Sequence, residues 1–158
     1  GTNLITSKDC PSFGGVYKLA AIMDKKTGKF IPKIKALRER GEDHKPGNKT
    51  TYRIYGKDSH KVIADIICLV GETFNEDEPL LLFDPVATWK KTLLAPGTYT
   101  MRELPVQVFK DGECVYHSPK VMDIQKYCKE ELNTLWDETK RLVNPHEVHV
   151  DLPSRFGI

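Results

Sequence analysis

The sequence lacks the long apolar runs and the charge excess that would place it in a membrane or on a nucleic acid. Its longest apolar stretches are Val62–Val70, which Asp65 interrupts, and Leu80–Phe83. Both are far shorter than the roughly 18–20 residues of a membrane-spanning helix. The 24 lysines and arginines nearly balance 22 aspartates and glutamates, so the formal net charge of the 158 residues is only +2. Since nucleic-acid binding needs a basic surface, we expect neither a membrane nor a nucleic acid as a partner.

Closely spaced cysteine pairs are also missing. Cys10, Cys68, Cys114 and Cys128 lie far apart, with no Cys-x-x-Cys motif, whereas zinc sites usually take two ligands from one turn. Cys68 lies in an apolar run and Cys128 on the apolar face of an expected helix, where free thiols pack as small hydrophobes. Four cysteines could form two disulfides, but we expect core or incidental thiols, no metal, and a reducing cytoplasm.

The first two thirds of the chain carry short β patterns. Residues 15–23 and 30–37 flank a polar turn and predict a β-hairpin that is apolar on both faces, with Pro32 at an edge. Asp111-Gly112 predicts a second, tight hairpin. Other strands are predicted at residues 50–55, 62–70, 80–83, 106–109 and 113–116.

After Tyr116 the apolar period changes from two to about 3.6. Ser118-Pro119 predicts the start of a helix and Asn144-Pro145 its end, which gives a helix of about residues 119–143. Its apolar stripe must pack on another surface. The stripe contains Val121, Ile124, Cys128, Leu132 and Leu135, with Trp136 beside it. The predicted fold class is therefore α+β, an antiparallel β-rich region followed by a long amphipathic C-terminal helix.

No set of side chains points clearly to catalysis. The five histidines do not pair with a nucleophile, and His146 and His149 are expected on different sides of an extended segment. Trp89 could stack on a base, although an aromatic anchoring a loop is the more common case. Five basic residues could face an anion or simply form a solvated surface: Lys33, Lys35, Lys45, Lys49 and Arg53. Gly1-Thr2 before a short helix would expose backbone N–H groups to phosphate, but the dipeptide alone is too common to carry a conclusion.

Several motifs together are more specific than any one of them. They are Gly1-Thr2-Asn3-Leu4-Ile5-Thr6, Pro11-Ser12-Phe13-Gly14-Gly15-Val16-Tyr17-Lys18-Leu19, Pro32-Lys33-Ile34-Lys35, Pro46-Gly47-Asn48-Lys49, Tyr52-Arg53-Ile54-Tyr55, Leu132 with Leu135 and Trp136, and Asn144-Pro145-His146. In this order they resemble the segment that follows the barrel core of nicotinate phosphoribosyltransferases. The resemblance covers nearly the whole chain.

The resemblance implies an enzyme of NAD salvage in the cytoplasm, a ligase or glycosyltransferase. Such an enzyme forms nicotinate mononucleotide and pyrophosphate from nicotinate and 5-phosphoribosyl 1-pyrophosphate, with Mg²⁺ and ATP hydrolysis, and is expected to be a homodimer. The β-rich region would be appended to a type II phosphoribosyltransferase α/β barrel. The chain begins Gly-Thr-Asn without Met, so we expect a piece of a longer protein that is inactive by itself.

The resemblance also implies a division of the chain and one site. Residues 1–37 would be a post-barrel loop and β-hairpin that pack with the barrel part, residues 38–49 a charged loop, and residues 50–158 the C-terminal β-rich domain. Gly1 and Thr2 match the Gly-Thr of the phosphate-binding loop, while no catalytic residue, metal ligand or bound cofactor is expected here. The loop before Pro46 departs from the family pattern. The alternative function is a free-standing, non-catalytic β-rich binding module related to that domain.

Overall fold

The structure of the protein is a computed structural model that describes residues 6, 12, 14–15, 18–34 and 46–154. The chain divides into two compact units, Gly1–Asn48 and Lys49–Ile158. In the first unit, β1 (Ala21–Met23) and β2 (Phe30–Pro32) form an antiparallel hairpin, with Ala21 opposite Pro32. The predicted hairpin is confirmed, with strands of only three residues.

A polar turn closes this first hairpin. The Asp24 carboxylate accepts hydrogen bonds from the Lys26 amide (3.0 Å) and the Thr27 hydroxyl (2.7 Å), and Gly28 takes a positive φ of 68°. The expected burial on both faces is not found, since Ile22 and Phe30 are each about half exposed. Strands this short cannot cover each other's apolar side chains.

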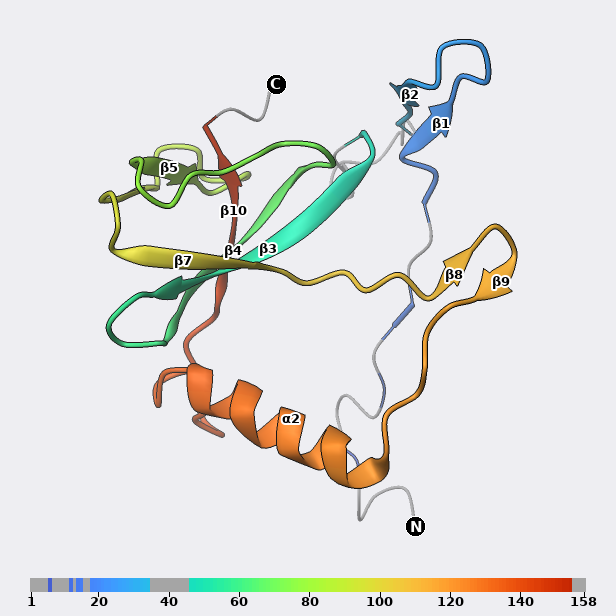
Figure 1. The fold of residues 1–158 in the computed structure, drawn as a ribbon. Helices are drawn as coiled ribbons and strands as arrows, with labels where there is room; N and C mark the ends of the chain where they lie inside the picture. Colours follow the sequence, from blue (N-terminus) through green and yellow to red (C-terminus); the bar gives the residue numbers. More distant parts are fainter. Residues whose placement is uncertain (1–5, 7–11, 13, 16–17, 35–45, 155–158) are drawn as a thin grey trace. The chain divides into compact units, whose positions relative to one another are not determined.

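The second unit contains a six-stranded sheet in the order β6-β5-β10-β4-β3-β7 (Figure 1). Its strands are β3 (Lys49–Gly56), β4 (Val62–Leu69), β5 (Leu80–Phe83), β6 (Lys91–Leu94), β7 (Tyr99–Glu103) and β10 (His149–Pro153). Every neighbouring pair is antiparallel except β10 with β4, which is parallel. The α+β, antiparallel β-rich class is confirmed, and the parallel pair is a feature that the local patterns did not predict.

One face of the sheet carries the hydrophobic core. Alternate residues of β4 are buried, as the period of two of a strand requires, and β3 contributes the buried residues Thr50 and Ile54 on its paired positions. The core consists of Ile54, Ala64, Ile66, Leu80, Leu82, Leu94 and Tyr99. The β4–β5 loop covers the free edge of β7, because Glu76 accepts the Met101 amide (2.7 Å) and the Tyr99 hydroxyl donates to the Glu78 carbonyl (3.0 Å).

Between β7 and β10 the chain forms a small hairpin and a helix. The hairpin pairs β8 (Phe109–Lys110) with β9 (Glu113–Cys114), and Asp111 and Gly112 both have positive φ. The tight Asp-Gly turn is therefore confirmed. The helix, α2, spans Val121–Thr134. Lys120 occupies its N-cap position, and the Lys120 side chain forms no capping hydrogen bond.

The predicted helix of about residues 119–143 is wrong in length. α2 has 14 residues, and Leu135 is already extended with φ −77° and ψ 147°. Side chains that contact distant parts of the chain end the helix. The Lys61 ammonium donates to the Asn133 carbonyl (2.7 Å) and the Leu135 carbonyl (3.0 Å). The Trp136 indole N–H donates to the Val62 carbonyl (2.7 Å). These hydrogen bonds take the place of those that a further helical turn would form. No helix in the described part of the chain is long and apolar enough to cross a membrane.

Candidate functional site

The phosphate-binding residues expected from the sequence, Gly1 and Thr2, lie outside the described residues. The same holds for Cys10, His44, Lys35 and Lys45. Their roles stay predictions. The candidate sites that the structure does describe lie in the second unit, where β3, β4, β7 and β10 meet the segments that follow them.

A cluster of charged side chains joins α2 to the sheet, and we call it the arginine network. Arg53 forms a two-pronged ion pair with Asp65 (2.7 and 2.8 Å), and Arg102 forms another with Glu131 (2.7 and 2.6 Å). The two pairs approach each other, with Arg53 Nη1 3.8 Å from Glu131 Oε2. The Arg102 guanidinium also lies over the Tyr55 ring, 5.4 Å from its centroid, where a cation is attracted by the ring electrons.

The arginine network is electrically balanced, so it attaches the helix and does not offer a free cation. Hydrogen bonding to Arg102 lowers the pKa of Glu131, and hydrogen bonding to Asp65 raises the pKa of Arg53. Both arginines are therefore committed to carboxylates. The anion-binding interpretation of the basic residues near Arg53 finds no support at Arg53, whose guanidinium is held by Asp65 across the β3–β4 pair.

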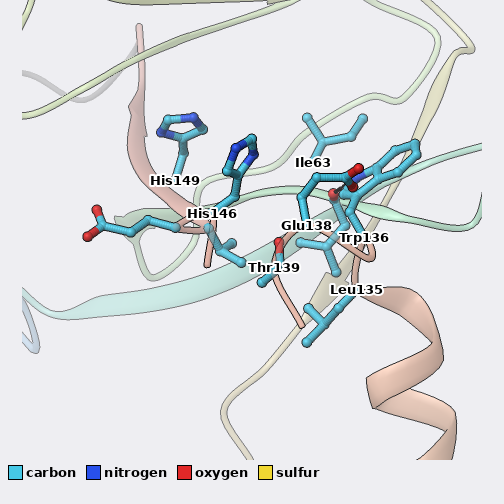
Figure 2. Close-up of a pocket in the computed structure, with 10 residues that line it drawn as sticks. Ile63, Leu135, Trp136, Glu138, Thr139, His146 and His149 are labelled. Atoms are coloured by element: carbon cyan, nitrogen blue, oxygen red, sulfur yellow. Dashed lines mark hydrogen bonds between the residues drawn. The ribbon is translucent and has the colours of Figure 1, made fainter. Parts of the chain in front are cut away.

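A cavity of about 480 Å³ lies where the segment after α2 returns to β10 (Figure 2). Ile63 of β4, Leu135 and Trp136 supply apolar walls, and Glu138, His146 and His149 supply polar groups. The backbone holds the segment in place, since the His146 amide donates to the Glu138 carbonyl (3.0 Å). An apolar wall with a few polar groups is the usual composition of a small-molecule pocket.

The two histidines of this cavity correct one interpretation of the sequence. His146 and His149 were expected on different sides of an extended segment, yet both line the same cavity. The reason is local: β10 begins only at His149, and residues 145–148 are not part of a strand, so the alternation of a strand does not apply between the two histidines. Within the described ranges, no three His, Cys, Asp or Glu side chains are close enough together to hold a metal ion.

Three other sequence interpretations have mixed outcomes. Trp89 was expected to anchor a loop but is 78% exposed. Cys68 is a buried thiol, as its apolar strand predicted, and burial raises its pKa to about 11. Cys128, expected on the apolar face of a helix, is exposed.

Sequence reasoning missed the residues that fix α2 in place. Glu131, Arg102 and Lys61 are 29 to 74 residues apart from their partners in sequence, so no local spacing could reveal them. Glu76 is a further example, since its carboxylate accepts the amide of Met101, 25 residues away.

Comparison with known proteins connects this unit to a family. The sequence model of the family described as nicotinate phosphoribosyltransferase C-terminal domain matches residues 48–156. A nicotinate phosphoribosyltransferase from Bacillus subtilis is 36% identical over 152 residues, which cover 96% of this chain and 30% of that protein. One from Homo sapiens is 26% identical over 157 residues, covering 99% of this chain and 27% of the human protein.

The fold comparison agrees with the sequence comparison. A crystal structure of human nicotinic acid phosphoribosyltransferase matches 70% of this chain and 22% of the human chain, with a TM-score of 0.57 and 21% identity. At this identity the likeness shows a shared fold. The chain spans between 24% and 30% of the length of the curated relatives that it matches.

Proposed function

Because the chain belongs to the nicotinate phosphoribosyltransferase C-terminal domain family, we propose that it is the C-terminal portion of an enzyme that joins nicotinate to 5-phosphoribosyl 1-pyrophosphate. The products are nicotinate mononucleotide and pyrophosphate, and ATP is hydrolysed. The observation that carries the proposal is the match to the Bacillus subtilis enzyme over 96% of this chain. That match includes residues before position 48, so it extends beyond the C-terminal domain itself.

The family resemblance suggests how the work is divided along the polypeptide. The described residues of this chain provide a packed sheet and a charge-paired helix. The Mg²⁺ and ATP sites, and the pocket for nicotinate, are proposed on that resemblance to lie in the portion of the enzyme that precedes this chain. In the intact enzyme, which we propose is a cytoplasmic homodimer, this chain would contribute scaffold and one edge of the phosphate site.

That edge is Gly1-Thr2. Consecutive backbone N–H groups at the start of a helix bind phosphate well, and glycine lets the backbone approach closely because it has no Cβ. In the full-length enzyme, Gly1→Val is expected to raise KM for 5-phosphoribosyl 1-pyrophosphate roughly tenfold or more, a loss of at least about 1.4 kcal/mol, with little change in KM for nicotinate. Steady-state kinetics with each substrate varied in turn provides the measurement. Equal changes in both constants would indicate a folding defect, and no change would remove Gly1 from the site.

The test of the proposed function begins upstream of this chain. We expect the preceding reading frame to encode a segment of barrel length that ends in Phe-Gly-Val directly before Gly1. The polypeptide extended by that segment should release nicotinate mononucleotide and pyrophosphate from nicotinate, 5-phosphoribosyl 1-pyrophosphate, Mg²⁺ and ATP. A chain that is expressed on its own, with no such segment in its gene, would favour the free-standing binding module instead.

A further inference from the structure

We propose that residues 104–134, which we call the arm, bind the portion of the enzyme that precedes this chain, through the apolar stripe of α2 and the β8–β9 hairpin. The inference rests on the proposed function, because that portion exists only if the chain is part of a longer enzyme. It deepens the proposed function by assigning the contact surface between the C-terminal domain and the rest of the polypeptide.

The arm leaves the sheet at the end of β7 and carries a concentration of exposed apolar side chains. Figure 1 shows the chain running from β7 through β8 and β9 into α2. The exposed apolar side chains are Val106, Val108, Phe109, Val115, Tyr116, Val121, Met122, Ile124, Tyr127 and Leu132. Single exposed apolar residues are ordinary, but a run of this density on adjoining elements is typical of an interaction surface.

The contacts between α2 and the sheet leave the apolar stripe uncovered. Glu131 holds the helix to the sheet through Arg102. At about 100° per residue, Glu131 lies at one margin of the stripe, about 20° from Ile124 and about 80° from Val121. No residue of α2 is buried, and Ile124 is 49% and Val121 79% exposed. The helix is thus attached through a charged residue beside the stripe, while the stripe itself stays accessible.

Neither element of the arm gains enough stability from its own contacts. A helix of about 12–15 residues is marginal in water without packing, and isolated two-stranded hairpins are marginal as well. α2 has 14 residues, and it is held to the sheet by polar contacts from Arg102 and Lys61 without any buried side chain. Each strand of the β8–β9 hairpin has two residues, all exposed. A covering surface would supply the missing burial at about 25 cal/mol per Å² of apolar area.

Two facts favour the preceding portion of the enzyme as this surface. The curated relatives have 70% to 76% of their length outside the region that this chain matches, and a family described as a C-terminal domain places that length before it. A partner in the same polypeptide also acts at a high effective concentration, in the millimolar range for short connections. It therefore outcompetes a second copy of the chain at ordinary protein concentrations.

Hydrogen–deuterium exchange tests the proposal on two proteins: this 158-residue chain and the polypeptide extended by its preceding segment. Exchange of amides in the arm is expected to slow roughly tenfold or more in the extended polypeptide, while β3 and β4 stay equally protected in both. An arm already protected in the 158-residue chain, or equally unprotected in both proteins, overturns the proposal. Protection of the short chain that rises with its concentration also overturns it, in favour of a second copy.

Two matched double variants of the extended polypeptide locate the surface. The first, Val121→Ser with Leu132→Ser, makes the apolar stripe polar. The second, Lys126→Ser with Glu130→Ser, changes the exposed charged side of α2 and leaves the net charge of the protein unchanged. The first is expected to abolish the added protection of the arm and the second to preserve it, with β4 protection reporting that each variant is folded. Equal behaviour of the two variants overturns the stripe as the contact.

Activity measured on the same samples separates this proposal from the proposed function. An extended polypeptide that makes nicotinate mononucleotide but leaves the arm unprotected contradicts the interface alone. An extended polypeptide that protects the arm but is inactive contradicts the proposed function while the interface stands.

Discussion

At the scale of single residues, Glu131 is the side chain whose loss is expected to weaken the attachment of α2 to the sheet most. Glu131→Gln removes a two-pronged ion pair with Arg102 and leaves that guanidinium over the Tyr55 ring without its carboxylate. Arg102 is 43% exposed, so solvent screens part of the interaction, and we expect a loss of about 1 kcal/mol in the free energy of unfolding at pH 7. Urea denaturation provides the measurement, with the exposed Glu130→Gln as its matched control.

The same substitution carries a pH dependence. Hydrogen bonding to Arg102 lowers the pKa of Glu131 from its usual 4.5. A carboxylate whose pKa is lower in the folded state stabilises that state above its unfolded pKa, and the benefit disappears as the pH falls through the folded pKa. The difference in stability between the parent chain and Glu131→Gln should therefore shrink as the pH falls below about 4.5. A difference that is unchanged at pH 3 would contradict the ion-pair explanation.

Cysteine reactivity is the second prediction at this scale. Burial raises the pKa of Cys68 to about 11, whereas Cys114 and Cys128 are exposed. Since the thiolate is the reactive form, iodoacetamide at pH 8 should label Cys114 and Cys128 in the native protein and Cys68 only after unfolding. Peptide mapping by mass spectrometry reads out each site. Labelling of native Cys68 at the rate of Cys114 would show that β4 is not packed as described.

At the scale of elements, a lysine from the β3–β4 turn is one of the two side chains whose contacts end α2. Lys61 donates to the carbonyls of Asn133 and Leu135, which would otherwise be unpaired at a helix C-terminus. Lys61→Met is expected to cost about 1 kcal/mol of stability and to speed amide exchange in the last turn of α2. Lys57→Met, in the same turn, is the control and should change neither. Unaltered exchange in Lys61→Met would mean that Trp136 alone ends the helix.

Local sequence patterns predicted some of these elements and not others. Alternation at residues 50–55 and short apolar runs at residues 62–70 and 80–83 predicted β3, β4 and β5, because neighbours along the chain decide those conformations. Asp111-Gly112 predicted the second hairpin in the same way. The end of α2 was not predictable this way. The apolar period continues through Leu142, which is fully exposed, while contacts from Lys61 and Val62 redirect the chain at Leu135. The parallel pairing of β10 with β4 likewise depends on residues more than 80 positions apart.

At the scale of the whole molecule, some functional features were predictable from the sequence and others were visible only in the structure. The order of motifs along the chain indicated the family, and the family comparison confirms it. The arginine network and the shared cavity of His146 and His149 came only from the structure, because they join segments that are distant in sequence. The exposed arm completes this picture of a domain that presents one surface to a larger neighbour.

Formation of nicotinate mononucleotide should be compared between two purified proteins, this 158-residue chain and the polypeptide extended by its preceding segment. Both receive nicotinate, 5-phosphoribosyl 1-pyrophosphate, Mg²⁺ and ATP, and product is quantified by chromatography against a blank without protein. We expect turnover by the extended polypeptide and none above the blank by the chain alone, because under the proposed function the chain supplies only scaffold and one edge of the phosphate site. Turnover by the chain alone, or an inactive but folded extended polypeptide, would contradict it.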